Sequence, residues 1–359
     1  MNDFSPYCTV EQASELIACC LAKNVPFYIC RYPGGELCRV GVQLQGHPKQ
    51  GAHDGFRVVP FDTDGDSMPF TIIPDAVVPD KAQLDAHPRL DVEPSQLQGE
   101  DVTQEEYLRQ ANSLIERMRQ GEMSKVVLSR TITRSCDTAK MLPRYYARLC
   151  VMYPHAYVFV VSYPGVCGWV GATPEVLLRS TQQGYATMAL AGTRKAGGVT
   201  AWGDKEIDEQ QYVARYIARI LEKEKDIRVE DRTETLRAGQ VEHLCTHFDI
   251  TTHPDAALRD RLVGAFHPTP AVAGTPTADA MQAIGLTEGR SRRYYGGYVG
   301  ESLSDGRCAL YVNLRSMEFT ADAVRLYVGG GLTAHSVAQD EWNETCAKAQ
   351  TMLSAFQDK

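Results

Sequence analysis

Apolar and polar residues follow two different periods along the chain. In residues 10–23, 103–122, 205–224 and 340–357, apolar side chains recur at helical spacing, which predicts helices. Thr103 begins the second of these segments and is expected to cap its helix. Other segments, such as "KVVLSRTITRS" and "AYVFVVSYPG", are short and rich in β-branched and aromatic residues, which predicts strands.

The order of these segments indicates the fold class. Predicted strands follow one another as hairpins, with helices between groups of strands. We therefore expect an α+β protein with sizeable antiparallel sheets. Residues 76–100 are polar and rich in proline, which is typical of a surface connection.

Composition excludes several classes of protein. The chain has 359 residues, of which 43% are hydrophobic and 23% are charged, enough for one large domain or two closely packed lobes. A net charge of −8 and a pI near 5.6 argue against a nucleic acid or an anionic membrane as the partner. A local basic pocket for a small anion is compatible with this charge.

The cysteines and the first residues indicate the compartment. The eleven cysteines are scattered and show no CxxC or Cys/His metal spacing. The start "MNDFSPYCTVEQ" lacks the basic and apolar regions of a signal peptide, and no apolar run is long enough to span a membrane. We therefore expect a cytoplasmic protein with reduced thiols.

Two predicted helices repeat one arrangement of carboxylates. Glu206 and Glu209 stand three residues apart, as do Glu341 and Glu344 on the last helix. Acidic first turns complement the helix dipole, so each pair alone is more often a solvated feature. If both pairs faced one gap, the four carboxylates would repel one another unless a cation lay between them. Oxygen ligands without His or Cys favour a hard ion, Mg²⁺ more than Zn²⁺.

Further candidates lie near predicted strand ends and on the last helix. Lys125 opens "KVVLSR" and Glu175 follows the Thr-Pro turn of "GATPEVLLR"; each alone is most often a solvent-facing charge. Lys348 lies four residues after Glu344 and shares its helix face. Glycines after strands let backbone N–H groups approach an anion, and an arginine matches a carboxylate. The motifs that contain such residues contribute Gly192, Thr193, Tyr295, Gly296, Gly297, Arg315 and the glycines at 329–331. Together with Lys348 they describe a pocket for a small molecule that carries carboxylates.

Seven motifs carry a resemblance to a known family. In order and approximate spacing, the chorismate-utilising enzymes have motifs similar to "KVVLSR", "GATPEVLLR", "LAGTR", "HPTPAVAGTP", "YYGGYVG", "YVNLRS" and "DEWNETCAK". The family includes isochorismate, salicylate, anthranilate and aminodeoxychorismate synthases. The resemblance implies two α/β lobes with large antiparallel sheets packed together, and an active site between sheet ends and helices. We expect residues 1–100, which match loosely, to form the N-terminal part of the fold and residues 101–359 the chorismate-binding catalytic region, together as one structural domain.

The resemblance also implies a cofactor and a set of site residues. It implies an Mg²⁺-dependent enzyme that acts on chorismate without an organic cofactor. By motif position, Glu209 and Glu344 would bind Mg²⁺ directly, and Glu206 and Glu341 would hold its water ligands. The implied substrate-binding residues are Gly192, Thr193, His243, Ala271, Tyr295, Arg315, Gly329 and Lys348.

Three positions bear on the reaction within this family. Lys125 matches the general base of the branch that uses water rather than ammonia, a role that requires surroundings favouring a neutral amine. Glu175 matches the general acid that protonates the departing C4 hydroxyl while water adds at C2. Ala271 matches the alanine of isochorismate synthases, where salicylate synthases and the ammonia-using enzymes have a threonine associated with pyruvate elimination.

These matches predict an isochorismate synthase of menaquinone or siderophore biosynthesis, acting as a monomer without an amidotransferase subunit. A salicylate synthase, which would go on to release pyruvate, is the nearest alternative. A catalytically silent protein that binds chorismate or a metal is an alternative of another class. Retention of Lys125, Glu175 and the four helix glutamates argues against the silent protein.

Overall fold

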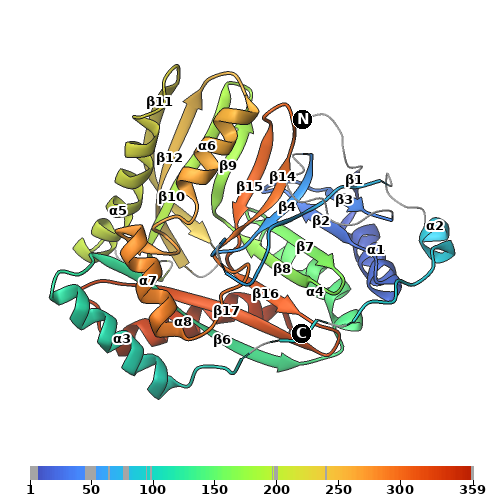
Figure 1. The fold of residues 1–359 in the computed structure, drawn as a ribbon, viewed down its shortest axis with the longest axis horizontal. Helices are drawn as coiled ribbons and strands as arrows, with labels where there is room; N and C mark the ends of the chain where they lie inside the picture. The colour runs from blue at the N-terminus through green and yellow to red at the C-terminus, as the bar shows by residue number, and fades with distance from the viewer. Residues whose placement is uncertain are drawn as a thin grey trace.

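Two large antiparallel sheets form the framework of the protein (Figure 1). The computed structural model describes residues 7–44, 54–63, 65–75, 81–93, 95–97, 99–195, 197, 201–238 and 241–356. The predicted α+β class is confirmed.

The first sheet has nine strands within the described residues. In spatial order they are β1 (Tyr7–Cys8), β3 (Cys38–Val42), β2 (Phe27–Arg31), β7 (Tyr157–Tyr163), β8 (Cys167–Thr173), β16 (Ser316–Phe319), β17 (Ala323–Leu332), β6 (Lys125–Ser135) and β13 (Gly274–Thr275). The long pair of β6 and β17 brings the strand that begins at Lys125 against the glycine run, with Val127 opposite Gly331.

The second sheet has eight strands within the same part of the chain. In spatial order they are β11 (Arg228–Ala238), β12 (Val241–Thr251), β10 (Gly184–Lys195), β9 (Val176–Thr181), β15 (Cys308–Val312), β14 (Tyr298–Ser302), β4 (Gly55–Val59) and β5 (Phe70–Ile72). Residues before 100 contribute strands to both sheets, since β2 pairs with β7 and β4 pairs with β14.

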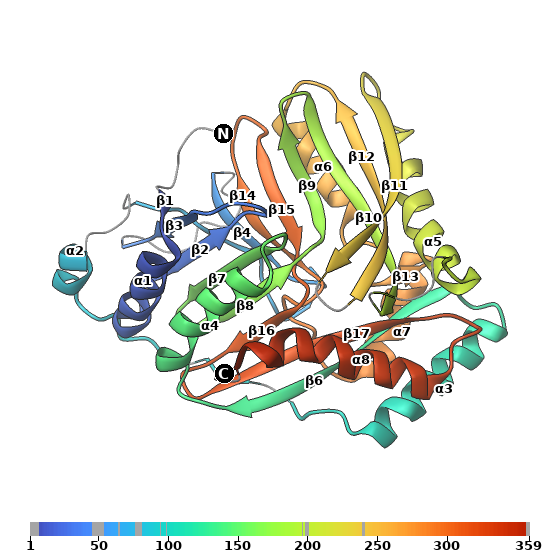
Figure 2. The same ribbon diagram turned by 180° about the vertical axis from the view of Figure 1, so that it is seen from behind.

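Helices pack on these sheets. The described ones are α1 (Val10–Lys23), α2 (Lys81–Ala86), α3 (Gln104–Arg119), α4 (Thr138–Met152), α5 (Asp204–Leu221), α6 (Ala256–Phe266), α7 (Thr277–Glu288) and α8 (Ala338–Leu353), with a 3₁₀ turn at Ser354–Phe356. Helix α5 packs on β10, α7 on β6, and α8 along β17, as Figure 2 shows from behind. The two acidic helices therefore each lie on a strand of a different sheet.

The central strands β2, β7 and β8 of the first sheet are buried on both faces. In β2, Phe27 and Ile29 join the core formed with α1 and α4, while Tyr28 and Cys30 join an aromatic core shared with the second sheet. Successive side chains of a strand point to opposite faces, so an apolar run without alternation is what such a strand needs. This core between the sheets holds the two layers together.

The structure confirms the helix predicted at residues 10–23 and the predicted Thr103 cap, but it places a helix within residues 76–100. Residues 10–23 form α1, and the Thr103 hydroxyl accepts a hydrogen bond from the Glu106 N–H at 3.2 Å, which confirms the predicted cap. The prediction that residues 76–100 form only a surface connection is wrong for α2, and residues 76–80 lie outside the described residues. None of the described helices combines the length and apolar character needed to cross a bilayer.

Candidate active site

A cavity of about 100 Å³ lies where strands of both sheets meet α5 and α8. Nine of the residues predicted for the site line it: Glu175, Gly192, Glu209, His243, Ala271, Tyr295, Arg315, Gly329 and Lys348. The remaining wall is largely apolar, with Val127, Pro174, Leu190, Ala191, Val272, Leu314, Leu326, Tyr327, Val328 and Met352, and Gly331 completes it. The fold thus gathers predicted site residues that are up to 173 positions apart in the chain, from Glu175 to Lys348.

Glu175 is a buried carboxyl between β8 and β9. Its side chain is almost fully enclosed, and Oε1 has no hydrogen-bond partner among the described residues. Burial raises the pKa of Glu175 to about 8, although Lys125 and then Arg315 act to lower it. The carboxyl therefore stays mainly protonated at neutral pH, as a proton donor must.

Lys125 is completely buried at the start of β6. Its Nζ lies 3.1 Å from Glu209 Oε1 on α5, an ion pair that lacks hydrogen-bond geometry. A Cβ placed on Gly331 would come within 2.4 Å of Glu209 Oε1 and 3.0 Å of Lys125 Cε. The glycine at this position in β17 therefore makes the room that the ion pair occupies.

Arg315 and His243 form a second polar pair of the cavity. Arg315 lies between β15 and β16 in a left-handed conformation (φ 47°), which is uncommon for a residue with a side chain. Its Nη2 donates to His243 Nε2 at 2.6 Å. Burial, then Arg315 and then Lys348, lower the pKa of His243 well below its usual value. The imidazole is therefore neutral and leaves the arginine charge available for an anion.

The charged face of α8 is buried at Glu341 and partly buried at Glu344 and Lys348. Lys348 Nζ contacts Glu344 Oε1 at 2.7 Å and donates to the Gly329 carbonyl at 3.1 Å. Burial alone lowers the pKa of Lys348, but Glu344 and then Glu209 outweigh it, so the pKa is raised. Glu341 is buried and accepts a hydrogen bond from the Ser336 hydroxyl at 2.7 Å.

Gly192 serves the packing of α5. It lies at a bulge of β10 with a φ of 67°, and a Cβ there would come within 2.6 Å of the Glu206 carbonyl oxygen. The glycine therefore lets the first turn of α5 approach the strand. Thr193 pairs with His243 across β10 and β12, and its side chain lies outside the described ones.

Ala271 and Tyr295 line the cavity from two different loops. Ala271 precedes β13 and is partly buried, while Tyr295 stacks on Tyr327 with ring centroids 5.4 Å apart. The Tyr295 hydroxyl would lie 3.2 Å from a Cβ on Gly329. A larger side chain at position 329 would thus press on this hydroxyl.

The acidic residues of α5 and α8 supply oxygen donors of the kind that Mg²⁺ prefers. Among the described residues, no three His, Cys, Asp or Glu side chains gather as a ready-made metal cluster. Glu209 and Glu344 instead each hold a lysine ammonium, so both carboxylates already neutralise a cation in this structure. The donor chemistry fits Mg²⁺, and the assignment of Glu206, Glu209, Glu341 and Glu344 as its ligands stays a prediction.

A larger groove of about 580 Å³ adjoins the cavity. The two share Pro174, Leu190, His243 and Arg315 in their walls. Arginines exceed carboxylates around the groove: its wall carries Arg179, Arg232, Arg237 and Arg315, with Asp249 as the acidic residue. In a protein of net charge −8, this surface offers an anion a locally positive approach to the site.

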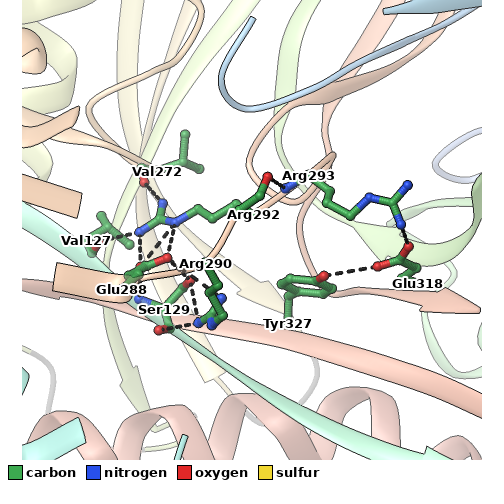
Figure 3. Close-up of polar contacts among 10 residues, drawn as sticks. Val127, Ser129, Val272, Glu288, Arg290, Arg292, Arg293, Glu318 and Tyr327 are labelled. Atoms are coloured by element: carbon green, nitrogen blue, oxygen red, sulfur yellow. Dashed lines mark hydrogen bonds and ion pairs between the residues drawn. The ribbon is translucent and has the colours of Figure 1, made fainter. Parts of the chain in front are cut away.

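One group of buried residues close to the cavity was missed from the sequence. Glu288 and Arg292 bind the backbone of β6 and of the segment after Ala271 (Figure 3). The two residues stand four apart in "TEGRSRR", but Glu288 ends α7, so Arg292 reaches it from the following loop. That spacing does not reveal that the pair is buried, so it offers no reason to place the pair near the site.

The cavity brings the buried Glu175 carboxyl together with Arg315, which contacts a neutral histidine, and with Lys348, an arrangement suited to a small anionic ligand. Comparison with known proteins identifies the family: residues 75–357, most of the chain, match the model for chorismate binding enzymes. The protein belongs to the chorismate-binding enzyme family.

Individual relatives agree with this family. The isochorismate synthase EntC of Escherichia coli K12 is 31% identical over 247 residues, which span 66% of this chain and 63% of that protein, less than two thirds of its length. The vibriobactin-specific isochorismate synthase of Vibrio cholerae is 25% identical over 371 residues, covering 98% of this chain and 91% of the relative. In fold, the structure of MenF, the menaquinone-specific isochorismate synthase from Escherichia coli, is similar with a TM-score of 0.77 and 20% identity, over 99% of this chain and 94% of MenF.

Proposed function

We propose that this protein is an isochorismate synthase that converts chorismate to isochorismate. The observation that carries the proposal is the Glu175 carboxyl, buried, raised in pKa to about 8 and facing a cavity that also contains Arg315 and Lys348. Several relatives are named isochorismate synthases, which supports the same reaction. The product would serve menaquinone or siderophore biosynthesis.

The reaction needs one base and one acid on the same ring. Lys125 would take a proton from water as the water oxygen bonds to C2, the ring double bonds shift, and the C4–O bond breaks. Glu175 would give its proton to the leaving oxygen, which departs as a second water molecule. One water enters and one leaves, so the substrate is isomerised without gain or loss of atoms.

Lys125 must part from Glu209 before it can act as a base. In the structure its ammonium is paired with that carboxylate, and a charged ammonium cannot accept a proton. We expect the pair to separate in the reactive complex.

The cations of the cavity would hold the two carboxylates of chorismate. Arg315 offers a planar fork and Lys348 a point charge, and the Tyr295 hydroxyl lies beside Gly329. Glu209 and Glu344 would hold Mg²⁺ directly, with Glu206 and Glu341 holding its water ligands. When bound, the ion would neutralise the ring carboxylate and polarise the departing C4 hydroxyl.

The wall opposite these charges would decide where the reaction stops. Ala271 presents a methyl group to the cavity and has no hydroxyl that could orient the enolpyruvyl group for elimination. We therefore expect isochorismate, rather than salicylate and pyruvate, as the final product. We further propose that the chain works as a cytoplasmic monomer, as one structural domain, without an amidotransferase subunit.

Product analysis tests the proposal directly. The purified protein is incubated with chorismate in Mg²⁺ or in EDTA, and the products are identified by chromatography and NMR. Isochorismate formed only with Mg²⁺ and without pyruvate is the expected result. Salicylate with pyruvate would overturn the role of Ala271, and folded protein that leaves chorismate unchanged would overturn the enzymatic proposal.

A further inference from the structure

A buried ion pair lies beside the catalytic cavity without forming part of its wall. Glu288 ends α7 and Arg292 follows in the next loop, with exposed fractions of 6% and 3%. Arg292 Nη2 lies 2.6 Å from Glu288 Oε1, and Nε lies 3.0 Å from Oε2 (Figure 3). The guanidinium also stacks over the Phe61 ring, 4.5 Å from its centroid.

Glu288 fastens α7 to the strand that carries Lys125. Its Oε1 accepts a hydrogen bond from the Ser129 N–H at 2.7 Å, and its Oε2 accepts one from the Ser129 hydroxyl at 3.0 Å. Ser129 lies four residues after Lys125 in β6. The carboxylate therefore fixes this part of β6 through both the backbone and a side chain.

Arg292 binds two carbonyl oxygens that belong to two neighbouring segments of the cavity wall. Its Nη2 donates to Val127 O at 2.6 Å, and its Nη1 donates to Val272 O at 2.8 Å. Val127 is two residues from Lys125, Val272 follows Ala271, and both line the cavity. One planar side chain thus ties the strand of the predicted base to the loop of the predicted specificity residue.

Backbone pairing also holds this loop against β6, including a hydrogen bond from the Ser124 N–H to the Thr275 carbonyl at 2.8 Å. The adjoining strand β13 pairs with β6 over two residues, Gly274 and Thr275, and the Val127 N–H donates to the Ala273 carbonyl at 2.8 Å. The guanidinium extends this contact by one further residue toward Ala271. Its five donors in a fixed fork are what allow it to serve two carbonyls and a carboxylate at once.

A pair buried this deeply is a poor source of net stability. The cost of removing two charges from water offsets most of their attraction, so hydrophobic replacements are often as stable. What the pair supplies is fixed geometry. Reacting groups misplaced by about 1 Å can cost on the order of 10²-fold in rate.

We propose that Glu288 and Arg292 are positioning residues for the reaction, setting the separation between Lys125 on β6 and the loop that carries Ala271. They act through Ser129, Val127 and Val272 and do not touch the substrate. The proposal rests on the proposed function for its effect on rate. Its effect on the geometry of the two segments is independent of that function.

The test compares Arg292→Lys with a matched control. A lysine keeps the charge but cannot reach both carbonyls and both carboxylate oxygens. The control is Arg39→Lys, because Arg39 is also buried and lies 3.1 Å from the buried Glu301, between β3 and β14 and away from the cavity wall. Both variants are compared with the native protein in melting temperature, kcat and KM for chorismate.

If Glu288 and Arg292 act by positioning, the loss of kcat should be larger than the loss of melting temperature explains. Arg292→Lys should lower kcat by about 10- to 100-fold, with KM changed far less, while Arg39→Lys keeps kcat at a comparable loss of melting temperature. Glu288→Gln should show the same separation, because it loses the charge that orders Arg292. Native kcat in a folded Arg292→Lys protein would overturn the proposal.

Hydrogen exchange separates failure of this proposal from failure of the proposed function. In folded Arg292→Lys protein, the amides of Val127 and Ser129 should exchange faster, and those of the Arg39 strand should not. If the native protein fails to convert chorismate but this exchange pattern appears, the function is wrong and the structural link stands. Unchanged exchange at both amides would overturn the link itself.

Discussion

Lys125 Nζ and Glu209 Oε1 lie 3.1 Å apart, with Gly331 leaving the space between β17 and α5 in which they meet. Glu209 therefore has two predicted roles. It is the counter-ion of Lys125, the predicted base, and it is a predicted ligand of Mg²⁺. If Glu209 is a ligand of Mg²⁺, the ion and Lys125 would compete for the same carboxylate.

Glu209→Gln should weaken Mg²⁺ binding by about tenfold or more, since a hard dication loses an anionic oxygen ligand. Isothermal titration calorimetry of the substrate-free protein measures the change. Asp208→Asn is the matched control, because Asp208 is exposed on the same helix and should leave the affinity as it is. Equal Mg²⁺ affinity in the native protein and Glu209→Gln would contradict the ligand assignment.

Gly331→Ala should lower kcat strongly by crowding the ion pair, because the added Cβ would lie 2.4 Å from Glu209 Oε1 and 3.0 Å from Lys125 Cε. Steady-state kinetics measures the loss. Gly264→Ala serves as the control: Gly264 is exposed within α6, and its Cβ would have no heavy atom within 4 Å. The control should retain native kcat and gain about 0.5–1 kcal/mol of stability. A Gly331→Ala enzyme with native kcat would show that the site tolerates displacement of the pair.

The pH dependence of turnover should report Glu175. Its pKa is raised to about 8, so the carboxyl is protonated below that pH and loses its proton above it. The donor form is thus lost as the pH rises, and kcat should fall above about pH 8. Glu175→Gln should lower kcat by about 10²- to 10⁴-fold, the usual range for a missing acid, and should remove the fall that Glu175 causes. A native enzyme whose kcat keeps rising through pH 9 would contradict the assignment of this acid.

Ala271→Thr should introduce release of pyruvate from chorismate. The new hydroxyl would enter the cavity wall, where it could orient the enolpyruvyl group for elimination. A coupled lactate dehydrogenase assay measures pyruvate, and Ala271→Ser tests whether a hydroxyl is enough without the extra methyl group. Isochorismate as the sole product of both variants would show that this position does not decide the outcome alone.

The sequence predicts the elements and the members of the site better than their contacts. Periodicity locates α1 and α3, and ordered motifs bring together the nine predicted residues that line the cavity. It misses α2 because six helical residues among prolines carry too short a pattern. It also cannot show that Glu209 holds Lys125, or that Gly192 serves the approach of α5, since both depend on how separate elements pack.

The partners of the buried pair Glu288 and Arg292 could not be predicted from the sequence. Its spacing is visible in the sequence, but its partners are backbone carbonyls of Val127 and Val272. Backbone partners leave no residue signature, because any side chain at those positions presents the same carbonyl. Only the packing of α7 against β6 shows which strand and which loop the pair connects.

The measurement that tests the account most directly is the reaction in ¹⁸O-labelled water, with Mg²⁺ and unlabelled chorismate, stopped at low conversion. If Lys125 activates water for attack at C2 and Glu175 releases the C4 oxygen, each isochorismate molecule should carry one heavy oxygen, at C2, by mass spectrometry and NMR. Unlabelled isochorismate would mean that the hydroxyl moves within the substrate, and it would contradict the roles given to both residues.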